Sequence, residues 1–136
     1  IKRADGPSTL ALTRQGLPPL RHDVSVNLCE KGGYRLKAAD AEKRVVLIAT
    51  GSEVSLAMDI AAKLEAAGHG ADVVSMPCTE LFDAQSADYR QELLGSDGVL
   101  RVSIDSFGAS APIEDLYAHF GLTVDAITPQ ILEKIG

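Results

Sequence analysis

Hydrophobic positions recur with two different spacings over most of the chain, and together they predict alternating strands and helices. Three short runs, at 45–49, 71–76 and 99–104, are apolar and rich in β-branched residues, which is typical of strands buried in a parallel sheet. Between the first two runs, apolar residues return every three or four positions, as they do on one face of a helix. These residues are Val54, Ala57, Ile60, Ala61 and Leu64. Since strand–helix–strand units need right-handed crossovers, the pattern predicts an α/β fold, a three-layer wound domain with a mostly parallel sheet.

Further helices are expected after the second and third strands. A short helix is predicted at 89–94, another at 110–120 and a last one at 125–135, each from its apolar spacing. Ser110 is suited to cap the second of these helices. Pro129 is expected in the first turn of the last helix, where a missing N–H is harmless.

The N-terminal part of the chain has a different organisation. The apolar stretch 8–13 predicts a strand, and the proline pair that follows can continue neither a strand nor a helix. Residues 17–42 have no sustained period and are predicted to be a linker, apart from a short edge strand at 34–36. We therefore expect the wound domain, 43–136, to be preceded by a strand and linker from a neighbouring domain.

Charge is distributed unevenly between these parts. Residues 1–44 carry nine basic and five acidic residues, whereas residues 45–136 carry four basic and fourteen acidic ones. The whole chain therefore has a net charge of −6. This balance argues against nucleic-acid binding, which needs a basic face, and no apolar stretch is long enough to span a membrane. Two explanations stay open: the basic part docks on the acidic domain, or it meets an anionic ligand.

Cysteine and histidine positions give no sign of a metal centre. Cys29 and Cys78 do not form a C-x-x-C pair, and the three histidines are far apart, so no metal site is predicted. Free, buried thiols in a reducing, cytoplasmic compartment are expected. The chain starts with Ile1 rather than Met, which indicates processing or a piece of a larger protein.

Two places could bind an anion. Arg14 lies at the carboxyl end of the first predicted strand, where open α/β sheets bind ligands, and its guanidinium suits phosphate or carboxylate. The alternative is a surface arginine or an inter-domain ion pair. Gly51 and Ser52 stand between a strand and a helix, whose free N–H groups can hold an anion, although Ser52 also suits a simple N-cap. No paired carboxylates and no placed histidine suggest a catalytic residue.

Several stretches in the same order resemble the transketolase family. They are Gly6–Gln15 with Leu17-Pro18, Gly32–Tyr34, Ile48–Val54, Val74–Pro77, Phe107–Pro112 and Phe120–Thr123. The resemblance assigns 1–16 to the end of the pyrimidine-binding domain, 17–42 to a linker and 43–136 to the C-terminal domain of a bacterial-type transketolase.

This resemblance implies a homodimer that moves a two-carbon ketol unit between sugar phosphates, using thiamine diphosphate and a divalent metal (Mg²⁺ or Ca²⁺). The cofactor lies between domains that this chain mostly lacks, so the chain is expected to bind none, to act in assembly and to be inactive alone. The family's Ser/Thr-Arg-Gln motif places its arginine on the substrate phosphate, here Arg14. Gly16 stands where the family usually has Asn.

Two other functions stay open. The chain could belong to a related thiamine diphosphate enzyme, a deoxyxylulose-phosphate synthase or the β part of a 2-oxo acid dehydrogenase, although the stretch Thr13–Pro18 argues against both. It could also be a non-catalytic module that binds an anion or effector at Gly51 and Ser52.

One junction departs from the family pattern. The strand at 99–103 runs directly into the loop at 105–112, where transketolases place a strand-and-helix segment. Two parallel strands need a crossover of about a dozen residues or more. We therefore predict that about twenty residues, a typical helix-plus-strand unit, are missing between Val102 and Ser106.

Overall fold

A four-stranded sheet forms the centre of the molecule. The computed structural model describes residues 6, 7, 9, 10, 12, 13, 16–104 and 121–136. The strands are β1 (Tyr34–Lys37), β2 (Lys43–Ala49), β3 (Gly70–Ser75) and β4 (Leu100–Ile104), and they lie in the order β1-β3-β2-β4. β2 runs parallel to both β3 and β4, while β1 is antiparallel to β3. The predicted mostly parallel sheet is confirmed.

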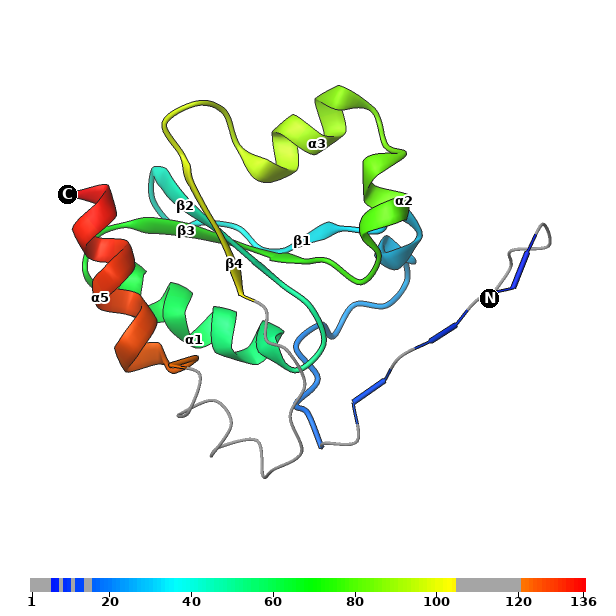
Figure 1. Cartoon of the computed structure of the whole chain (residues 1–136), viewed down its shortest axis with the longest axis horizontal. Coiled ribbons are helices and arrows are strands. Elements are labelled where there is room, and N and C mark those ends of the chain that lie inside the picture. The colour runs from blue at the N-terminus through cyan, green and yellow to red at the C-terminus, as the bar shows by residue number, and fades with distance from the viewer. Residues whose placement is uncertain (1–5, 8, 11, 14–15, 105–120) are drawn as a thin grey trace.

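Helices cover both faces of this sheet (Figure 1). On one face lie α1 (Glu53–Ala66) and α5 (Val124–Ile135); on the other lie α2 (Thr79–Asp83) and α3 (Ala87–Leu94). A short 3₁₀ helix, η1 (Leu28–Lys31), precedes β1. The predicted three-layer α/β architecture is therefore confirmed.

The central strand β2 is apolar on both faces because each face packs against helices. Val45 and Leu47 belong to the cluster formed with α1 and α5, whereas Val46 belongs to the cluster formed with α2 and α3. All five residues predicted for the apolar face of α1 are buried. Burial of each large apolar side chain contributes about 1.5–3 kcal/mol, so these two clusters explain why the continuous apolar run becomes a strand.

The end of α1 shows how the sequence returns the chain to the sheet. Gly68 has a φ of +87°, a left-handed conformation that suits glycine, directly after the helix. The N–H of Gly68 donates to the carbonyl of Glu65 and the N–H of His69 to that of Leu64, both at 2.9 Å. These paired bonds form a Schellman motif, which ends the helix at Ala66, shortly before β3 begins at Gly70.

Two predictions about secondary structure differ from the observed elements, and one observed helix was not predicted. The described residues of the stretch 8–13 are not in a strand, and the side chains of Leu10 and Leu12 are 68% and 80% exposed rather than packed in a sheet. Pro129 lies in the second turn of α5, because Thr123 caps the helix and it begins at Val124. The sequence missed α2, whose five residues are too few to show a helical period.

The sheet begins earlier in the chain than the wound domain proposed from the sequence. The short edge strand predicted at 34–36 is confirmed as β1, so part of the range 17–42 belongs to the sheet. At the junction where residues are predicted to be missing, Val102–Ile104 is continuous strand. Asp105 and Ser106, like the helix predicted at 110–120, lie outside the described residues. None of the described helices has the length and apolar character to cross a membrane.

Candidate functional site

A buried carboxylate holds basic residues near the amino ends of β2 and β3. The side chain of Asp72 is only 4% exposed. Lys43 Nζ donates to it at 3.0 Å, the backbone N–H of Ala39 donates at 2.8 Å, and Arg35 Nε lies 3.0 Å from the same carboxylate. A buried acid with this many donors is satisfied, so the cluster is structural.

A second ion cluster lies beside it on α1. Lys37 Nζ donates to Glu65 Oε1 at 2.7 Å, and the backbone N–H of Asp40 donates to the same oxygen at 3.0 Å. Burial alone would raise the pKa of Glu65, but these hydrogen bonds outweigh it and lower that pKa from 4.5 to about 2. Burial likewise opposes the charge of Lys37, yet Glu65 and Asp40 hold the pKa of Lys37 above its ordinary value.

Most basic side chains between 31 and 44 are therefore occupied within the domain. Beyond these two clusters, Arg44 donates to the carbonyl of Ile135 at 2.8 Å, and Lys31 lies 4.4 Å from the centre of the Tyr89 ring. For this stretch, the first of the two explanations for the basic charge holds: it docks on the domain.

The carboxyl ends of β2 and β3 present a different environment. An open pocket of about 290 Å³ lies there, and we call it the arm pocket. Four of its lining residues come from the arm, which we define as residues 16–31: Leu17, Pro18, Leu20 and Arg21. The remainder come from β1 (Tyr34 and Leu36), β3 (Ser75) and the start of α1 with its preceding loop (Gly51, Val54 and Ser55).

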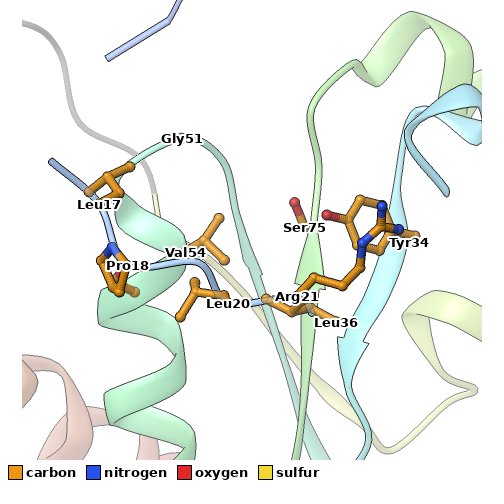
Figure 2. Close-up of a pocket in the computed structure, with 10 residues that line it drawn as sticks. Leu17, Pro18, Leu20, Arg21, Tyr34, Leu36, Gly51, Val54 and Ser75 are labelled. Carbon is orange, nitrogen blue, oxygen red and sulfur yellow. The ribbon is translucent and has the colours of Figure 1, made fainter. Parts of the chain in front are cut away.

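Figure 2 shows how the two walls of the arm pocket differ. Leu17, Pro18 and Val54 lie on one side, and Arg21, Tyr34 and Ser75 lie on the other. The guanidinium carbon of Arg21 is 5.5 Å from the centre of the Tyr34 ring, a cation–π contact. Arg21 Nη1 is shielded from solvent and has no hydrogen-bond partner in the described part of the chain.

The predicted anion site at Gly51 and Ser52 is only partly assembled with this pocket. Gly51, with a φ of +55°, lines the arm pocket, whereas Ser52 does not. Ser52 occupies the N-cap position of α1, as predicted, but it has helical backbone angles and its side chain makes no capping hydrogen bond. The first turn also contains the acid Glu53, which already complements the helix dipole. An anion bound by Gly51 and Ser52 stays a prediction.

The structure does not describe Arg14, and it corrects the expected burial of the two cysteines. Arg14 lies outside the described residues, so its contact with a substrate phosphate stays a prediction. Cys29 is exposed and Cys78 half-buried, both as free thiols, so the expectation of buried thiols is wrong. The reason is that η1, which holds Cys29, buries none of its residues.

Within the described ranges, no three His, Cys, Asp or Glu side chains gather where they could hold a metal ion. Sequence reasoning missed Arg21 because nothing around it in the linker marks it. Its surroundings come from β1, β3 and α1, which only the fold brings together.

Comparison with known proteins agrees with this architecture. A sequence model described as the "Transketolase-like TK C-terminal domain" matches residues 32–104. The chain is 46% identical to a chromosomal transketolase of Cupriavidus necator over 90% of its length, and 40% identical to transketolase 1 of Vibrio vulnificus over all of it. It spans only 21% and 24% of those two relatives.

The alignment with the Vibrio protein also bears on the junction after β4. It is 158 positions long and covers the whole 136-residue chain, so 22 residues of the relative have no counterpart here. That number agrees with the predicted loss of about twenty residues, and the family match ends at Ile104, beside the predicted junction. The position of the loss stays a prediction.

Solved structures show the same relationship. The crystal structure of transketolase from Campylobacter jejuni is 34% identical, superposes with a TM-score of 0.70 and matches 88% of this chain and 21% of that one. Transketolase from Leishmania mexicana is 39% identical over 76% of the chain, with a TM-score of 0.65. The chain therefore belongs to the transketolase family, and residues 32–104 match its C-terminal domain.

Proposed function

We propose that the parent protein is a transketolase that transfers a two-carbon ketol unit between sugar phosphates, and that this chain is its C-terminal part. The family match and the identity of 40–46% over 90–100% of the chain carry this proposal. Structures of a Pichia stipitis transketolase, 28–29% identical, are described as complexes with xylulose 5-phosphate, sedoheptulose 7-phosphate and fructose 6-phosphate. These sugar phosphates are the substrates that we propose for the parent.

The proposed division of labour leaves the chemistry to other parts of the parent. Thiamine diphosphate with Mg²⁺ or Ca²⁺ would supply the nucleophilic carbanion and the electron sink. This chain would contribute to the assembly of a homodimer and hold no cofactor. Free thiols at Cys29 and Cys78 fit a reducing, cytoplasmic setting and a role in sugar-phosphate metabolism.

Arg14 is the residue through which we propose that this chain meets the substrate. A guanidinium offers a planar fork of donors to phosphate, and binding far from the reacting carbon positions the sugar. One charge-assisted hydrogen bond contributes about 1.5–3 kcal/mol. In the parent, Arg14→Ala should therefore raise KM for phosphorylated sugars roughly 10- to 150-fold, with a much smaller effect on unphosphorylated analogues.

Arg44→Ala is a suitable control, since Arg44 donates to the carbonyl of Ile135 within the domain. An equal loss for phosphorylated and unphosphorylated substrates would remove Arg14 from the phosphate site.

The parent's activity is tested directly with purified protein. With thiamine diphosphate and Mg²⁺, we expect transfer of a two-carbon unit from xylulose 5-phosphate to an aldose phosphate. Condensation of pyruvate with glyceraldehyde 3-phosphate, or oxidation of a 2-oxo acid, would instead assign the parent to one of the two related enzymes.

A further inference from the structure

The arm pocket contains a guanidinium nitrogen without a hydrogen bond. Arg21 Nη1 is shielded from solvent, and the described residues offer it no acceptor. Buried polar groups in proteins are nearly always hydrogen-bonded, so an exception calls for an explanation. The contact with Tyr34 orients the guanidinium above the ring but supplies no acceptor for this N–H group.

The charge of the arm pocket is also unbalanced. Among the described residues that line it, Arg21 is the one charged side chain, and no acid is present. This contrasts with Lys43 and Arg35, which face Asp72, and with Lys37, which faces Glu65. In a chain with a net charge of −6, a half-buried cation facing a pocket without acids favours an anionic ligand.

A second pocket, of about 420 Å³, shows the opposite arrangement and serves as a comparison. It is lined by two acids, Asp83 and Asp97, as well as by Arg90 and Arg101. Arg101 donates to the carbonyls of Leu94 and Gly95 at 2.9 and 2.7 Å. Arg90 Nε in this second pocket, like Arg21 Nη1, is shielded and has no hydrogen-bond partner among the described residues. The two pockets therefore differ in charge: two acids face two arginines in the second pocket, whereas no acid lines the arm pocket.

The remaining walls of the arm pocket limit what the anion can be attached to. Leu17, Pro18, Leu20 and Val54 form an apolar wall opposite the guanidinium, and the hydroxyl residues Ser55 and Ser75 also line the pocket (Figure 2). Its volume of about 290 Å³ lies just below the range for ligand sites, about 300–1,000 Å³, so the ligand must be small. A small ligand with one anionic and one apolar end fits these walls.

We propose that the arm pocket binds a small aliphatic carboxylate. The carboxylate accepts hydrogen bonds from Arg21, and the aliphatic body packs against Leu17, Leu20 and Val54. A single guanidinium fork matches a carboxylate, whereas the hydroxyls of a sugar phosphate would lose water against the apolar wall. The carboxyl edge of β2 and β3 is also where open α/β sheets bind ligands. The proposal is independent of the parent's catalytic activity.

The test is a titration of the ¹⁵N-labelled 136-residue chain with 3-methylbutanoate, followed by amide chemical shifts. We expect saturable shifts confined to Arg21, Gly51, Ser55, Ser75 and their neighbours. Arg21→Gln should weaken binding at least tenfold, since it removes the charge and the fork. Arg44→Gln, a matched change of an arginine outside the pocket, should leave the affinity unchanged.

Further probes separate carboxylate binding from its alternatives. If 3-methylbutan-1-ol binds as tightly as 3-methylbutanoate, the charge has no role and the proposal fails. Tighter binding of inorganic phosphate, or shifts distributed outside the pocket, would also overturn it. If Arg21→Gln detaches the arm, the amide shifts of that variant would show it. Ser75→Ala, at a lining residue on β3, then replaces it, and we expect the affinity for 3-methylbutanoate to fall two- to fivefold. Unchanged affinity would reject the pocket.

Thermal melting of the parent protein with the same probe tests whether the arm pocket is open to a free ligand there. A rise in the melting temperature of the parent with 3-methylbutanoate, absent in its Arg21→Gln variant, supports a free ligand. Binding by the 136-residue chain without any binding by the parent would show that the parent's own residues fill the arm pocket, and would overturn the proposal.

Discussion

Basic residues at the two ends of the parallel strands differ in their partners. Near the amino ends, Asp72 and Glu65 engage Arg35, Lys37 and Lys43 in ion clusters. At the carboxyl ends, Arg21 faces the arm pocket, whose described lining residues include no acid, although the charge of Arg21 helps to lower the pKa of Asp23 outside that lining. All four cations belong to the same basic segment of the sequence. The difference teaches that the basic composition of a segment does not determine what its charges do. A basic side chain stabilises the fold where an acid of the domain pairs with it, and it is available to bind a ligand where none does.

This difference has an energetic consequence that experiments can measure. Removing one partner of a buried ion cluster leaves uncompensated charge in the protein, which is strongly destabilising. Arg21 forms no ion pair in the described part of the chain, so removing its charge leaves no buried acid uncompensated. Substitutions at the amino ends should therefore reduce stability, and substitutions at Arg21 should reduce ligand binding instead.

The largest effect is expected for Asp72→Ala. This change leaves Lys43 and Arg35 without their buried acid and removes the acceptor of the Ala39 N–H. We expect the free energy of unfolding to fall by about 3–5 kcal/mol, measured by urea denaturation. Asp97→Ala, at an exposed position, is the control. A loss below about 1 kcal/mol would contradict a structural role for the cluster.

A smaller, pH-dependent effect is expected for Glu65. Since folding depresses the pKa of Glu65 from 4.5 to about 2, its contribution is present above about pH 4.5 and is lost as the pH falls toward 2. Glu65→Gln should lower the free energy of unfolding at pH 7 by about 1.5–3 kcal/mol. Its stability should also fall less steeply between pH 5 and 2 than that of the wild type. If the free energy of unfolding falls as steeply between pH 5 and 2 in the variant as in the wild type, Lys37 and Glu65 are not coupled. Glu133→Gln, on the exposed side of α5, is the control.

The smallest effect on stability is expected for Arg21→Gln. It removes the cation–π contact with Tyr34, which contributes about 0.5–1 kcal/mol at a partly exposed site. The free energy of unfolding without ligand should therefore fall by less than about 1 kcal/mol. A loss as large as that of Asp72→Ala would make Arg21 a structural residue and would abolish the contrast between the two ends of the strands.

The fold was largely predictable because burial imposes a period on the sequence. The run at 45–49 and the helical spacing from Val54 to Leu64 come from packing on both faces of β2 and on one face of α1. Pro129 was misplaced because the capping residue Thr123 sets the start of α5, and a Thr is common enough to give no clear signal. The stretch 8–13 was predicted as a strand on local pattern alone, and its described residues do not form one, since a local pattern does not show which segments pair in a sheet.

The candidate site was much less predictable. Arg21 comes from a linker without periodicity, and its neighbours Tyr34 and Ser75 are far from it in the sequence. Tyr34 and Ser75 become adjacent only because β1 and β3 pair in the register that aligns them. At Ser52 the sequence position was informative but the contact was not: Ser52 stands at the N-cap of α1, yet with helical backbone angles its side chain makes no hydrogen bond to the first turn.

The central claim is that this chain is the C-terminal part of a transketolase and carries none of its chemistry. The most direct measurement compares ketol transfer from xylulose 5-phosphate by the parent protein and by the 136-residue chain, both with thiamine diphosphate and Mg²⁺. We expect turnover by the parent, and neither turnover nor thiamine diphosphate binding, by calorimetry, for the chain alone. Ketol transfer by the isolated chain would contradict the claim, as would a parent protein without transketolase activity.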